Sequence, residues 1–198
     1  MGQRMPPSTS LPGDPRPRLG PALTTLLTDL CARVPAFSGL KPDRILVVAG
    51  AARDTSRATV RWLLESGTPR VLVDGHVRHF EITLRPLFFL KANGLGRLVT
   101  LFHELFHLAP DGSGLADERR HRGNHRSNDV TVESLARSYV DAAPAALLAP
   151  LGHEGEVLMD QWRIRPSRDC ALRQVTREHL FLGPVPMHTP KRERCVWW

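Results

Sequence analysis

Residues 95–108 read Leu-Gly-Arg-Leu-Val-Thr-Leu-Phe-His-Glu-Leu-Phe-His-Leu, and their apolar residues follow a helical spacing. The leucines at positions 98, 101, 105 and 108 recur at intervals of three and four residues, which is typical of a helix with one buried face. Pro110 and then Asp111-Gly112 come next, and both interrupt helical structure. The stretch therefore predicts a helix over 95–108 that is anchored in the core of the domain.

This predicted helix contains the pattern HExxH at residues 103–107. His103 and His107 are one helical turn apart and project from the same face, so their imidazoles can share one metal ion. Glu104 is rotated by about 100° from His103, which places a carboxylate beside the metal and not on it. Such a carboxylate can move protons as a general acid and base, and Zn²⁺ is the metal that suits two imidazoles. The alternative is an ordinary buried helix whose two histidines are satisfied by hydrogen bonds.

A catalytic zinc site requires a third protein ligand, and residues 111–129 hold the candidates. The histidines of this segment are His121 and His125, and its carboxylates include Asp111, Asp117 and Glu118. We favour His125, because it follows Gly123-Asn124, a turn that can direct a side chain back toward the helix. Either histidine can equally be a solvated loop residue. Pro110 and Ser113 occupy the positions where a metzincin has glycine and histidine, so that class is excluded.

Arginines are concentrated in the same segment, where residues 119–122 read Arg-Arg-His-Arg. A run of this kind is most often a solvated loop. Close to a metal site, however, Arg119 and Arg120 could bind a substrate carboxylate or stabilise an oxyanion.

Strands are predicted before the helix. Residues 44–50 form a short β-branched apolar run, and residues 58–64 alternate as a second strand, although a helix is possible there. Residues 70–84 predict one hairpin, because Asp74-Gly75 supplies the positive φ angles of a tight turn. Further helices are expected from Pro21 to before Pro35 and over 129–141, and Pro144 and Pro150 are expected to break the chain after the second of them.

The net charge of +7 on 198 residues arises at the two ends of the chain. Residues 1–19 are rich in proline and carry +2, residues 161–198 carry +5, and residues 20–160 are neutral with sixteen basic and sixteen acidic residues. We therefore expect a disordered leader at 1–19, one domain at 20–160 and a basic extension at 161–198. The absence of a long apolar run argues against a membrane span, and the N-terminus and three scattered cysteines favour a cytoplasmic protein.

The order of these elements resembles the HExxH metallopeptidase families of bacteria and phages, which are small zincins. The resemblance is carried by Ile45-Leu-Val-Val48, Leu84-Arg-Pro-Leu-Phe-Phe89 and Leu101-Phe-His-Glu-Leu-Phe-His-Leu-Ala-Pro110, and it covers about residues 40–142. It implies His103, His107 and His125 as metal ligands, Glu104 as the catalytic acid and base, and Arg119 or Arg120 as a loop arginine. This chain differs in the extra arginines and histidines of that loop, which keep His121 in competition with His125.

The expected fold is thus α+β: a zincin-like domain with a small, twisted, mostly antiparallel sheet packed on the HExxH helix, plus one or two further helices. The strand at 77–84 is the expected edge that pairs with an extended peptide. The expected function is a zinc-dependent hydrolase, a peptidase in which Glu104 activates zinc-bound water. The alternatives are a nucleic-acid-associated or repressor-regulating protein, and a non-catalytic interaction module stabilised by zinc.

Overall fold

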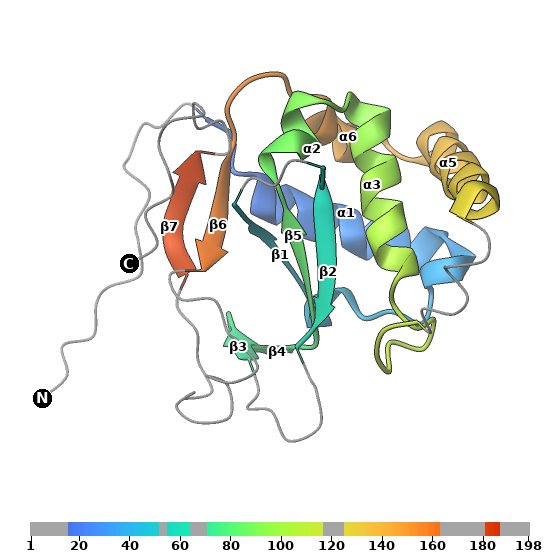
Figure 1. Ribbon diagram of the computed structural model, residues 1–198, viewed down its shortest axis with the longest axis horizontal. Coiled ribbons are helices and arrows are strands. Elements are labelled where there is room, and N and C mark those ends of the chain that lie inside the picture. The colour runs from blue at the N-terminus through green and yellow to red at the C-terminus, as the bar shows by residue number, and fades with distance from the viewer. Residues whose placement is uncertain (1–15, 52–54, 64–70, 117–124, 163–180, 187–198) are drawn as a thin grey trace, which may run out of the picture.

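A computed structural model of the chain describes residues 16–51, 55–63, 71–116, 125–162 and 181–186 (Figure 1). In these residues a mixed sheet is combined with several helices, as expected for an α+β protein.

The main sheet has five strands in the order β2-β5-β1-β6-β7. Their bounds are Ala58–Trp62 for β2, Phe80–Leu84 for β5, Ile45–Ala49 for β1, Leu158–Trp162 for β6 and Phe181–Pro186 for β7. The strand β1 pairs in parallel with both β5 and β6, whereas β2 pairs antiparallel with β5 and β7 pairs antiparallel with β6. The expectation of a mostly antiparallel sheet is therefore wrong at the centre of the sheet.

The predicted hairpin at 70–84 is divided in two. Its first part is correct: β3 (Val71–Val73) and β4 (His76–Arg78) pair across Asp74 and Gly75, whose φ angles are 51° and 77°. At His79 the chain leaves this small sheet, and β5 joins β1 instead. A separate strand at 80–84 can bury Phe80, Ile82 and Leu84 beneath the helices, which a single long hairpin strand would not do. The strand expected at the open edge thus lies inside the sheet, and the edge strands among the described residues are β2 and β7.

The helices outnumber the one or two that were expected beside the HExxH helix. They are α1 (Leu19–Arg33), α2 (Pro86–Leu90), α3 (Gly94–Phe106), α5 (His125–Ala142) and α6 (Ala145–Gly152), with 3₁₀ turns at Pro35–Phe37 and Pro42–Arg44. The helix predicted over 95–108 is confirmed as α3. Pro144 precedes α6 as its N-cap, but Pro150 lies within α6 and does not end it. Figure 1 shows α3 running beside β2, with α5 next to α3 on the side away from the sheet.

The core lies between one face of the sheet and the helices. Phe80, Ile82 and Leu84 of β5 face this core together with the leucines of α1 and α3. On the other face, Leu46 and Val48 of β1 pack with Val71 and Val73 of β3 and with Trp162.

The fully buried carboxylate of Glu81 connects strands on that second face. It accepts hydrogen bonds from Arg61 Nη2 of β2 (2.6 Å), Thr83 Oγ1 of β5 (2.8 Å) and Trp162 Nε1 of β6 (2.7 Å). Burying a charge is tolerated when it is paired in this way. The cluster therefore fixes the position of β2 at the edge.

The ends of the domain extend beyond the expected boundaries of 20 and 160. Leu158 N donates to Pro17 O (2.9 Å), and Arg16 pairs with Glu156 (3.3 Å), so residues 16–18 lie along β6. The expected boundary after residue 160 falls inside β6, and β7 belongs to the same sheet. Among the helices of the described residues, none has the length and hydropathy needed to cross a bilayer.

Candidate metal and catalytic site

The HExxH residues are positioned by a firmly anchored helix. Asn93 caps the start of α3, because its Oδ1 accepts the backbone N–H of Gly96 (2.9 Å). The predicted leucine stripe is fully buried, and Phe102 and Phe106 both make edge-to-face contacts with Phe37, with ring centroids 5.1 and 5.0 Å apart. The orientation of α3 is therefore set on several sides before its histidines are considered.

His103 and His107 converge from the half-buried face of α3. Their Nε2 atoms lie 3.2 Å apart, and the two rings meet edge to face with centroids 4.8 Å apart. Gly96 and Thr100 precede them on the same helix face and are also only half-buried. The two imidazoles therefore project from the same helix face, as the spacing predicts, and their Nε2 atoms lie at hydrogen-bond distance from each other.

The separation of the two nitrogens is compatible with a shared zinc ion. Zinc–nitrogen bonds are about 2.0–2.1 Å long. Two nitrogens 3.2 Å apart would therefore subtend about 100° at one ion, close to the tetrahedral angle that zinc adopts. The donor set thus fits zinc as far as these two ligands are concerned.

Glu104 points from α3 toward the sheet and is only 6% exposed. Burial raises the pKa of its carboxyl group to about 7, although a hydrogen bond from the backbone N–H of Val60 and the positive charge of Arg85 partly oppose this rise. A carboxylate with a pKa near neutrality is suited to take up a proton and release it again at physiological pH.

The contact with Val60 follows from the pairing of β2. Arg85 N donates to Arg57 O and Leu63 N donates to His79 O, so alternate residues of the strand, starting at 57, bond to β5 and its flanks. The residues between them, Ala58, Val60 and Trp62, direct their backbone groups to the open edge. The site therefore consists of a metal-type histidine pair, a buried carboxylate and the open edge of a sheet.

The buried side chain of Arg85 links β2 to the chain that follows β1. It is 3% exposed, and its guanidinium donates to Ala51 O beyond β1 (2.8 Å) and to Thr59 Oγ1 of β2 (3.3 Å). Because Thr59 precedes Val60, these hydrogen bonds help to hold the backbone that contacts Glu104.

A compact turn after α3 brings the chain back to the histidines. Ala116 N donates to His107 O (2.8 Å), and Ala109 N donates to Gly114 O (2.8 Å). Leu108 and Leu115 form an isolated antiparallel β-bridge. Ala116, at the end of this turn, therefore lies beside His107.

The candidates for a third metal ligand lie mostly outside the side chains that the structure describes. Arg119, Arg120 and His121, together with Asp117 and Glu118, lie outside the described residues. His125 is the first residue of α5, which begins earlier than the expected start at about residue 129, and only the backbone position of His125 is described. The expected turn at Gly123-Asn124 lies outside the described residues. Asp111 is described but exposed, and its carboxylate accepts Ser113 N (3.0 Å). Across the described part of the chain, no three metal-ligating side chains gather together.

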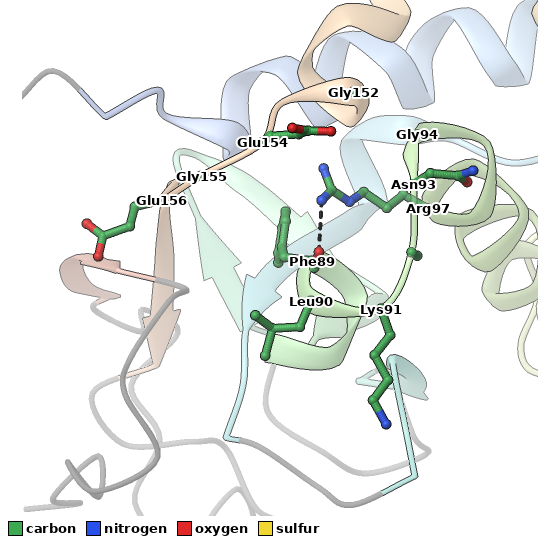
Figure 2. A pocket seen from close by; sticks show the side chains of 11 residues that line it. Phe89, Leu90, Lys91, Asn93, Gly94, Arg97, Gly152, Glu154, Gly155 and Glu156 are labelled. Carbon is green, nitrogen blue, oxygen red and sulfur yellow. Dashed lines mark hydrogen bonds between the residues drawn. The ribbon is translucent and has the colours of Figure 1, made fainter.

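A cavity of about 560 Å³ lies at the other end of α3 (Figure 2). Its wall includes Arg97, whose guanidinium donates to Leu151 O (2.7 Å), His153 O (2.7 Å) and Phe89 O (2.9 Å). These bonds connect α2, α3 and the end of α6. We assign Arg97 a structural role, because its donors serve backbone carbonyls and lie at the helix start, away from His103.

The sequence did not identify Val60 or Arg85 as parts of the site. Val60 contributes a backbone N–H, for which no residue type is diagnostic. Arg85 was visible only as a lone arginine between an apolar strand and a proline. Comparisons with protein-family models, with curated proteins and with solved structures give no match to this chain.

Proposed function

We propose that the protein is a zinc-dependent hydrolase, and specifically a zincin-like peptidase. The observation that carries this proposal is the convergence of three groups: the Nε2 atoms of His103 and His107, 3.2 Å apart, and the buried carboxylate of Glu104 beside an open strand edge. A single helix supplies all three side chains, as the HExxH pattern predicts.

The residues of the site divide the chemical work. His103 and His107 would hold a zinc ion through Nε2, and the bound zinc would supply the Lewis acidity that polarises a carbonyl and acidifies water. The carboxylate of Glu104 takes a proton from the attacking water and then delivers it to the leaving nitrogen. The raised pKa of about 7 favours both transfers near neutral pH.

A peptide or protein substrate fits the geometry, because an extended chain can pair with the outward backbone groups of β2. The strand β2 replaces residues 77–84 in this role. The N–H of Val60 faces Glu104, so a peptide paired with the outward carbonyl group of Val60 and with the backbone groups of Trp62 would pass beside the carboxylate.

The third ligand comes, in this proposal, from the segment after the turn at 107–116. His125 remains the preferred ligand and His121 the alternative, since Ala116, at the end of that turn, lies beside His107. Arg119 and Arg120 would then lie near the substrate. A cytoplasmic location agrees with the free, buried thiol of Cys31.

The proposal is tested by adding the zinc-loaded protein to a reduced, carboxymethylated protein and following the new peptide termini by mass spectrometry. We expect cleavage by wild type and a loss of about 10²–10⁴-fold in Glu104→Gln. Glu133→Gln removes an exposed carboxylate on α5 and should leave the rate unchanged. Equal rates for wild type and Glu104→Gln would reject a catalytic role for Glu104.

A further inference from the structure

Two exposed apolar side chains border the candidate site. Among the described residues, the large apolar side chains that remain exposed are Trp62, Leu90, Leu115 and Val140. Trp62 ends β2, and Leu115 lies in the turn after α3. A Cβ atom added at Gly114, the neighbour of Leu115, would lie 3.8 Å from the indole ring of Trp62. The indole therefore packs on the turn that returns to His107.

The register of β2 places this indole on the side of the sheet that faces α3. Trp62 stands opposite Phe80 and Val60 stands opposite Ile82, and both partners are buried in the helix-side core. Directly opposite residues of a pair share a face, so Trp62 and Val60 lie on the same side of the sheet. Trp62 is nevertheless 37% exposed, whereas Trp162 is 2% exposed. Part of the indole is therefore in contact with solvent beside the turn that carries the exposed side chain of Leu115.

We infer that Trp62, together with Leu115, forms an apolar subsite that selects a large apolar side chain of an extended peptide bound along β2. This inference rests on the proposed peptidase function. The occupant is a peptide because the carbonyl group of Val60 and both backbone groups of Trp62 point to the open edge, next to the carboxylate of Glu104 that the N–H of Val60 faces. The peptide residue opposite Trp62 lies two positions from the residue opposite Val60, and its Cβ would be about 4.5–5.5 Å from that of Trp62. Selection should therefore act within a few residues of the cleaved bond.

The test uses capped octapeptides of alanine and serine in which a single phenylalanine is moved through successive positions. With the zinc-loaded wild type, we expect kcat/KM to rise about tenfold when phenylalanine stands at one fixed spacing from the cleaved bond. Trp62→Ala should reduce this ratio to about twofold or less, and Trp62→Phe should retain most of it. Leu90→Ala is the matched control, because it removes an exposed apolar side chain from α2 and should leave the ratio at its wild-type value.

The same peptides separate this inference from the peptidase proposal. If wild type cleaves none of them, the peptidase proposal fails. The preference for phenylalanine is then measured as the affinity of each peptide for zinc-loaded Glu104→Gln, by calorimetry. Binding that is about tenfold tighter for one phenylalanine peptide, and loses this preference in the Trp62→Ala background, would support the subsite without catalysis. An equal ratio in wild type and Trp62→Ala, or no binding of any peptide, would overturn the inference.

Discussion

The backbone N–H of Val60 on the edge strand β2 lies close enough to the carboxylate of Glu104 on α3 to lower the pKa of that carboxyl group. The contact joins the helix that carries the histidine pair to the strand edge on which a peptide could lie. It also keeps the carboxylate in a buried position, where ionisation is costly. The position of Glu104 should therefore affect both the stability of the protein and the proton transfers proposed for this carboxylate.

Because Glu104 is buried, we expect its ionisation to lower the free energy of unfolding of the metal-free protein in a pH-dependent way. The pKa rises from 4.5 to about 7 on folding, so the folded state binds the proton more tightly than the unfolded state. Stability is therefore lost as the pH rises from 4.5 through 7, and Glu104→Gln, which keeps an acceptor for Val60, should remove this loss. We expect the chelator-treated variant to be more stable than wild type by up to about 3 kcal/mol at pH 8, with the difference vanishing below pH 4.5.

Urea unfolding of chelator-treated wild type and Glu104→Gln at both pH values measures this difference. Glu133→Gln on α5 is the control, since it removes an exposed carboxylate from a helix surface. A Glu104→Gln variant that gains nothing between pH 4.5 and pH 8 would show that ionised Glu104 is not buried at a cost.

Arg97, at the other end of α3, is expected to contribute strongly to the stability of the fold. Its guanidinium serves three carbonyl groups and lies over the Phe89 ring, 5.1 Å from the centroid. Arg97→Met should leave these carbonyls without their donors and cost about 2–4 kcal/mol in the free energy of unfolding. Arg137→Met, which breaks only an exposed pair with Glu133, should cost less than about 1 kcal/mol. Chemical denaturation compares the two, and similar losses would contradict the structural role of Arg97.

The helix of the site could be predicted from the sequence because its information is local. The leucine periodicity of 95–108 and the HExxH spacing each depend on neighbours within a turn or two. The helix that the periodicity predicts is confirmed, and the metal site that the spacing predicts stays a prediction. The partner of Glu104 could not be predicted in this way. Val60 reaches it only because β5 leaves the hairpin at His79 and inserts between β1 and β2, a choice decided by the burial of Phe80, Ile82 and Leu84 across the whole domain.

The zinc affinities of two histidine variants distinguish His125 from His121 as the third ligand. If His125 completes the site, His125→Ala should weaken zinc binding by at least about 100-fold, while His121→Ala should retain the wild-type affinity. Competition with a chromogenic chelator measures both constants. The reverse order would assign the ligand to His121, and wild-type affinity in both variants would exclude the two histidines.

The most direct test of the account is the zinc content of the purified protein, measured by elemental analysis for wild type, His103→Ala and His153→Ala. His153 is the control, because it is a half-buried histidine whose Nε2 lies 3.3 Å from Glu156 O at the opposite end of α3. We expect one zinc per chain in wild type and in His153→Ala, and a loss of zinc in His103→Ala. Wild type without zinc, or His103→Ala with a full zinc content, would contradict the proposed zinc site.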